Sequence, residues 1–152
     1  MKSDSDTGVS VYTPPVPSVA HPLRLYKKEK LCSATAIDRL FVPSAVRPES
    51  VLAYPLRAVW MSDSLRRSDT PLQFLISVPK RRLHHAVDRV TMRRRVREAY
   101  RLHRHVLEIP AGMRYNLAFV YVADRCVPYA RVERAVCRIL AEVGKSISAG
   151  KQ

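Results

Sequence analysis

The chain has 152 residues, with 27 Lys and Arg against 13 Asp and Glu, and a formal net charge of +14. That length suits one domain with tails, and the charge favours a polyanionic partner such as nucleic acid. The sequence has no run of about 18 apolar residues that would span a bilayer and no signal-peptide pattern at its N-terminus. We therefore expect a cytoplasmic protein with no membrane partner.

Residues 1–22 combine Ser, Asp and Thr with prolines and predict a disordered N-terminal extension. We expect the folded domain to cover residues 23–145 and a frayed tail to follow at 146–152. Within the domain, Ser33 is a suitable cap for a helix over residues 34–41.

The next elements alternate between extended and helical patterns. Residues 50–61 predict either two extended segments or one strand bent at Pro55. A strand over 72–78 leads into a basic helix that starts at 86 and ends near 108, and a strand over 114–122 precedes a helix that starts near Pro128. The fold class is therefore α+β, with a single sheet of about four strands and the element order αβββαβα.

The basic helix separates its charges from its apolar side chains. At about 100° per residue, six of its seven arginines fall in an arc of roughly 140° and its apolar residues in a second arc of roughly 160°. Like-charged neighbours four residues apart cost a few tenths of a kcal/mol each, so we expect an anionic partner on this side. The arginines in the first arc are Arg89, Arg93, Arg94, Arg97, Arg101 and Arg104.

The sequence offers little for catalysis by the protein itself. No carboxylates are spaced to hold Mg²⁺, and no Cys or His pair has helical ligand spacing, so we predict no catalytic residue and no protein metal site. His84 and His85 are interpreted either as added donors near phosphate or as ordinary surface residues. Cys32, Cys126 and Cys137 are interpreted as free thiols that pack as small buried apolar residues.

RNA is the favoured polyanion, because strands flank the basic helix and a DNA-reading helix-turn-helix would need a second short helix there. Arginines at helical spacing suit phosphates, which they bind through two hydrogen bonds at once. The predicted RNA-binding residues are Lys80, Arg81, Arg82, Arg89, Arg93, Arg94, Arg97 and Arg101.

Three motifs follow one another in this region: FLISVPKR at residues 74–81, AVxR at 86–89 and, after Arg93 and Arg94, REAYR at 97–101. Together they resemble the signature of the bacterial ribonuclease P protein subunit, in which a strand ending in Ser-Val-Ser-Lys-Lys leads into a helix with Ala-Val-x-Arg-Asn-Arg. The sequence departs from that signature where Val90 and Thr91 replace the Asn and the second Arg.

The resemblance implies a left-handed βαβ crossover through the basic helix. It also implies a non-catalytic subunit of a ribonucleoprotein endoribonuclease that hydrolyses the phosphodiester between the 5′ leader and precursor tRNA. The catalytic RNA would carry the chemistry with Mg²⁺ as its cofactor, and no protein partner would be required. The basic helix would contact that RNA, while Ile37, Phe41 and Trp60 would line a cleft for the leader, with Lys80 and Arg81 at its rim.

Two other functions stay open at this point. The chain is also compatible with an RNA-binding module of another ribonucleoprotein, similar to a ribosomal protein. A self-sufficient metal-dependent nuclease is the second alternative, and it would need the clustered carboxylates that the sequence lacks.

Overall fold

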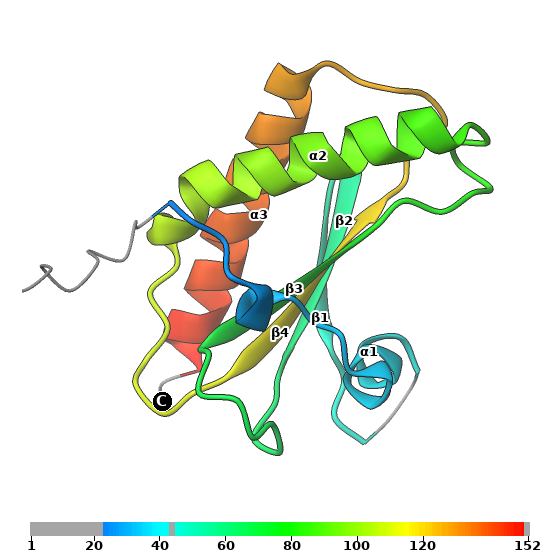
Figure 1. Cartoon of the computed structure of the whole chain (residues 1–152). Coiled ribbons are helices and arrows are strands. Elements are labelled where there is room, and N and C mark those ends of the chain that lie inside the picture. Colours follow the sequence, from blue (N-terminus) through cyan, green and yellow to red (C-terminus); the bar gives the residue numbers. More distant parts are fainter. Residues whose placement is uncertain (1–22, 43–44, 151–152) are drawn as a thin grey trace, which may run out of the picture.

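The computed structural model describes residues 23–42 and 45–150 (Figure 1). Their order confirms the predicted αβββαβα arrangement, with two short 3₁₀ turns added. The predicted N-terminal extension lies outside the described residues. The elements are η1 (Lys27–Glu29), α1 (Ala34–Phe41), β1 (Glu49–Ala53), β2 (Leu56–Ser62), β3 (Leu72–Ser77), α2 (Ala86–His103), η2 (Arg104–Val106), β4 (Tyr115–Tyr121) and α3 (Tyr129–Ala149).

The four strands form one sheet in the order β1-β2-β4-β3. β1 pairs antiparallel with β2, and β2 pairs antiparallel with β4. Two separate strands therefore flank Pro55, and the alternative of one bent strand is wrong. β3 and β4 are parallel neighbours, so α2 forms the crossover between them. The left hand of that crossover stays a prediction.

The sheet has a thickly covered face and a thinly covered face (Figure 1). Alternation along β4 sends Leu117, Phe119 and Tyr121 into the larger core, which α2 and α3 cover. Ala118 points the other way and joins a small cluster under α1. β4 is thus covered on both faces.

Packing of α2 follows its predicted apolar arc. Met92, Val96, Ala99 and Tyr100 are all buried against the sheet and α3. The Tyr100 ring lies with its centroid 4.4 Å from that of Phe74. The helix is shorter than predicted, because the chain tightens into η2 after His103.

α1 begins as predicted, with the Ser33 hydroxyl accepting a hydrogen bond of 3.4 Å from the Ala36 amide. Leu40, on its inner side, is buried in the small cluster with Val59 of β2. α1 therefore lies on the thinly covered face and leaves part of that face open.

Two predictions are wrong, one about the end of the last helix and one about burial of the cysteines. α3 continues to Ala149, so residues 146–149 are not a frayed tail, and burial of Ile147 at 2% exposure explains why. Cys32 and Cys126 are exposed, and Cys137 is only partly buried, although all three are free as predicted. Among the described helices, none has the length and hydropathy that a membrane span needs.

The last turn of α3 gives a direct test of its packing. Ile147→Ala removes a buried side chain and should lower the free energy of unfolding by about 2 kcal/mol or more. Ser148→Ala, at an exposed neighbouring position, is the control and should change it by less than about 0.5 kcal/mol. Urea denaturation followed by circular dichroism measures both, and equal effects would contradict the packed end of α3.

Candidate nucleic-acid interface

We call the arginines of the predicted arc the α2 row, and the middle of this row is available to a ligand. Arg94 and Arg97 are exposed and Arg93 is half-buried. Within the part of the chain that the structure describes, these three guanidinium groups have no hydrogen-bond or ion-pair partner. At 100° and 1.5 Å per residue they fall within an arc of about 100° and about 6 Å along the helix, so they form a compact cationic patch.

The two ends of the row are tied to the protein itself. At the N-terminal end, Arg89 donates hydrogen bonds to the Leu83 and His84 carbonyls, at 2.9 and 2.7 Å. At the C-terminal end, Arg101 contacts Glu98 through two hydrogen bonds, of 2.6 and 2.9 Å, which lower the pKa of that carboxyl. These arginines remain cationic, but part of their donor capacity is used to hold the chain around α2.

Arg104 has a third role, at the end of α2. It pairs with Glu29 and donates to the Arg24 carbonyl at 2.6 Å, and both carboxylate and guanidinium are largely buried. The segment before α1 is thereby fixed against α2. Arg104 is in the predicted arc, yet its contacts are structural.

The turn between β3 and α2 extends the cationic surface. Lys80 and Arg81 are exposed, whereas Arg82 is half-buried and forms an ion pair of 2.9 Å with Asp124. His84 and His85 are exposed beside them. The structure thus places the predicted RNA-binding residues of the turn directly before the start of the helix that carries the others.

Val90 lies inside this arginine arc. At 100° per residue it falls between Arg93 and Arg94, and 42% of its surface is exposed. Thr91 donates to the Val87 carbonyl at 2.9 Å, so its hydroxyl is used within the helix. Of the two residues that depart from the family signature, Val90 is therefore an apolar group that faces solvent, and Thr91 has a hydroxyl that is already hydrogen-bonded within the helix.

Trp60 does not line the predicted cleft. It is 4% exposed and packs in the larger core under the helices, whereas Ile37 packs in the small cluster on the opposite face of the sheet. The period of two along β2 explains the error, since Val59 and Met61 point to the α1 side and Trp60 to the other. Phe41, at 48% exposure, does lie on α1 beside that open face.

A row of four side chains crosses the open part of the sheet. Strand register aligns Leu52 of β1, Arg57 of β2, Val120 of β4 and Ser77 of β3, all on the α1 side. Leu52 is 62% exposed, Arg57 is exposed, and the other two are partly exposed. We call these four residues the cross-strand row. At its β3 end it leads to Lys80 and Arg81.

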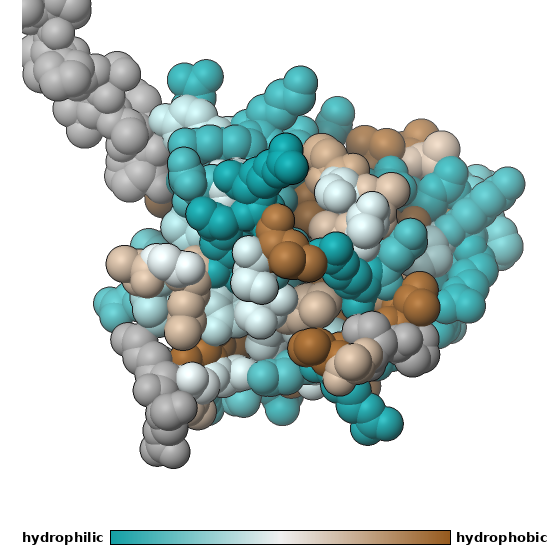
Figure 2. Space-filling model, turned by 90° about the horizontal axis from the view of Figure 1, so that it is seen from below, coloured by the Kyte–Doolittle hydropathy of each residue, from teal (hydrophilic) through white to brown (hydrophobic). Residues whose placement is uncertain are grey.

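The surface around α1 mixes apolar and polar groups. Seen from below, hydrophobic residues lie as separate spots among hydrophilic side chains (Figure 2). Such a surface suits local contacts with a polar ligand better than one broad apolar interface.

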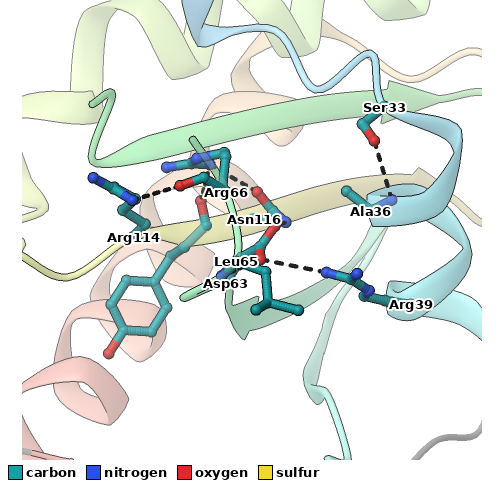
Figure 3. Close-up of polar contacts among 9 residues, drawn as sticks. Ser33, Ala36, Arg39, Asp63, Leu65, Arg66, Arg114 and Asn116 are labelled. Carbon is teal, nitrogen blue, oxygen red and sulfur yellow. Dashed lines mark hydrogen bonds and ion pairs between the residues drawn. The ribbon is translucent and has the colours of Figure 1, made fainter. Parts of the chain in front are cut away.

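A buried polar cluster holds α1 and the β2–β3 loop in place (Figure 3). Asp63, 7% exposed, accepts a hydrogen bond of 2.9 Å from the Asn116 side chain and pairs with Arg39 of α1 at 3.5 Å. Arg66 donates to the Asn116 side-chain oxygen at 2.8 Å and to the Tyr115 carbonyl at 3.1 Å. Burial lowers the pKa of Arg66. The cluster fixes the border of the open sheet face.

Sequence reasoning missed both Arg57 and the Asp63 cluster. Strand alternation could have identified Arg57. It stands next to Ala58 and three residues before Trp60, the aromatic of β2, so a period of two places it on the opposite face from both. Asp63 and Asn116 are 53 residues apart, so no local pattern links them. Within the described residues, no three His, Cys, Asp or Glu side chains are grouped to hold a metal ion.

Comparison with known proteins shows which family this chain resembles. A sequence model described as Ribonuclease P matches residues 25–143. Two relatives from different strains of Porphyromonas gingivalis are both called Ribonuclease P protein component. One is 32% identical over 126 residues, which cover 81% of this chain and 88% of the relative, and the other is 30% identical over 138 residues, which cover 89% and 93%.

Solved structures support the same fold. The RNase P protein of Staphylococcus aureus superposes with a TM-score of 0.58 at 14% identity, over 78% of this chain and 97% of that one. A mutant of the Staphylococcus aureus protein gives a TM-score of 0.60 at 15% identity, over 78% and 90%. At these identities the likeness concerns the fold alone.

Trp60 provides a test of its assigned position, because it is the single tryptophan of the chain. Its burial in the larger core predicts blue-shifted emission and weak quenching by iodide in the folded protein, with both reversed in denaturant. Adding a short single-stranded RNA should leave the iodide quenching unchanged. Strong quenching of the folded protein, removed by RNA, would restore Trp60 to a ligand-binding surface. Phe41→Trp in a Trp60→Phe background is the matched exposed control.

Proposed function

The chain belongs to the ribonuclease P protein family, and we propose that it binds the catalytic RNA through α2 while the open sheet face holds the 5′ leader of precursor tRNA. The protein subunit role belongs to the family. The assignment of each RNA to a surface is our proposal, and it is supported by where unpartnered cations and accessible apolar groups lie in the fold.

The patch of Arg93, Arg94 and Arg97 supports the binding of RNA by α2. Guanidinium groups bind phosphate oxygens in pairs, and three of them on one helical side match a polyanion with closely spaced charges. No internal partner within the described chain competes for them. The unfavourable like-charge contacts of the free protein are relieved when phosphates bind.

The leader face follows from the cross-strand row. A single-stranded RNA needs apolar or aromatic groups for its bases and cations for its phosphates. Phe41 and Leu52 supply the first, and Arg57 with Lys80 supplies the second. This juxtaposition of exposed apolar and cationic groups beside α1 is the observation that carries the leader assignment.

The charge of the protein also supports a division of roles between protein and RNA. We infer that Mg²⁺ is bound by the catalytic RNA, which carries out the hydrolysis, and that the protein acts by lowering repulsion between two polyanions. It would do so in the cytoplasm, as a component of the tRNA-processing ribonucleoprotein and without a further protein partner.

Reconstitution tests this function. We expect a 5′-extended precursor tRNA to be cleaved at low Mg²⁺ by the matching RNA subunit plus this protein much faster than by either alone. At raised Mg²⁺ the RNA alone should gain activity, because added cations replace part of the protein's screening. Tight RNA binding without any stimulation would favour a module of another ribonucleoprotein. Cleavage by the protein alone would favour a self-sufficient nuclease.

The leader assignment makes a separate prediction. Phe41→Ala combined with Arg57→Ala should weaken holoenzyme binding of precursor tRNA by about tenfold, since loss of stacking on one base costs about 1–3 kcal/mol. Both side chains are exposed, so the fold should tolerate the change. Binding of mature tRNA should stay the same.

Val106→Ala is the control for this experiment, because Val106 is 53% exposed and follows α2 on the other side of the sheet. It should leave both affinities unchanged. An equal loss for precursor and mature tRNA in the Phe41 and Arg57 variant would remove the leader from this face.

A further inference from the structure

α3 carries a second row of cations on its outer side, apart from α2. Arg131, Arg134, Arg138 and Lys145 are all exposed. At 100° and 1.5 Å per residue they fall within an arc of about 60° and extend for about 21 Å along the helix. We call these four residues the α3 row.

Packing holds the α3 row outward. The opposite side of α3 is buried through Val132, Val136, Ile139 and Val143, each 0% exposed. Rotation of the helix would expose that apolar side, and each such residue contributes roughly 1.5–3 kcal/mol when buried. The cations are therefore fixed on the surface by the fold.

The arginines of the row have no internal partner in the described part of the chain. Lys145 pairs with Glu142 at 3.0 Å, and the other acid on this helix, Glu133, contacts His103 of α2 at 2.8 Å. Arg134 and Arg138 are four residues apart and repel each other. Three unpaired arginines in series repel one another by a few tenths of a kcal/mol for each pair, and a bound anion would offset that repulsion.

The α3 row and the α2 row face different directions. Arg95 and His103 reach the α3 segment, through the Val127 carbonyl and Glu133, and they lie roughly 160° and 120° around α2 from Arg97. On α3, Glu133 lies roughly 130° from the centre of the α3 row. Each row thus points away from the contact between the two helices, which cross in Figure 1, so one RNA segment does not serve both.

The surroundings of the α3 row indicate the form of nucleic acid. Its exposed neighbours are small, Ala130 and Ala141, and the aromatic residue of this helix, Tyr129, lies on the buried side about 160° from Arg131. Single-strand binding sites need aromatic platforms for bases, which this surface lacks. A row of guanidinium groups with small residues between them fits the phosphate backbone of a duplex, which is bound by shape and charge.

The position of the α3 row indicates which duplex. α3 covers the face of the sheet opposite to α1 and the cross-strand row, so a precursor tRNA whose leader lies on the α1 face is held on the other side. We propose that the α3 row binds a base-paired stem of the catalytic RNA, at a site separate from the RNA contacted by α2. This inference rests on the proposed function and makes the protein a bridge between two parts of its RNA.

A salt titration with matched variants tests the bridge. Arg131→Ala, Arg134→Ala and Arg138→Ala together should reduce the salt dependence of binding to the catalytic RNA by roughly 0.7–0.9 slope units for each phosphate that the variant no longer neutralises. The corresponding triple Lys variant should keep most of that dependence. The control is Lys27→Ala, Arg47→Ala and Arg67→Ala, which removes the same charge from exposed scattered positions and should change the slope less.

Hydroxyl-radical footprinting of the catalytic RNA locates the binding site. The α3 triple Ala variant should no longer protect a base-paired segment, and the variant with Ala at Arg93, Arg94 and Arg97 should no longer protect a different segment. An unchanged slope and footprint would overturn the inference. So would an equal loss of affinity for isolated precursor tRNA, which would assign the α3 row to the tRNA body.

These outcomes are distinct from failure of the proposed function. If the unmodified protein fails to stimulate cleavage at all, the function is wrong. If it stimulates cleavage and the α3 variant behaves like the unmodified protein in slope and footprint, only the α3 inference is wrong. Circular dichroism melting of each variant confirms that folding is retained.

Discussion

Burial of one side of α2 is the constraint on which the other features depend. Met92, Val96 and Tyr100 are nearly inaccessible, and each such side chain contributes roughly 1.5–3 kcal/mol. The like-charged arginine contacts on the opposite side cost only a few tenths of a kcal/mol each. Hydrophobic burial therefore outweighs the repulsion and keeps the guanidinium groups facing outward in the free protein. The surface is already formed in the free protein, so binding of the proposed RNA partner would not have to order it.

The crossover sets where that surface meets the sheet. Because β3 and β4 are parallel neighbours, α2 must start near the end of β3 and return across one face. The turn with Lys80 and Arg81 follows β3 directly, at the end where Ser77 contributes to the cross-strand row. A path of positive charge thus leads from the edge of the open sheet face to the start of α2. The two proposed RNA surfaces share a border, which is suited to a substrate and a catalyst that must meet.

Periodicity in the sequence predicts most of this fold and only part of the site. Helical spacing identifies α2 and its arginine arc, and strand alternation identifies β4, because those patterns are local. The prediction for Trp60 is wrong because it relies only on the residue being aromatic. The period of two along β2 places Trp60 on the face of the sheet opposite to Val59. The Asp63 cluster joins residues 53 apart and depends on the register of the sheet. The predicted end of α3 falls short because Ile147 is stabilised by tertiary packing, which propensity does not report.

The cationic side chains fall into two groups, those used inside the protein and those without an internal partner in the described chain. Arg66 and Arg104 are used inside the protein, where they fix loops and the segment before α1. Arg97 on α2 and Arg138 on α3 have no internal partner in the described chain and point in different directions. A single cationic side would contact RNA phosphates from one direction only, and phosphate contacts position a nucleic acid without reading its sequence. Two diverging rows and one open sheet face would instead restrict how the proposed RNA and its substrate sit around the protein. In the proposed function, orientation comes from the geometry of the helices, and the bound RNA supplies the reacting groups.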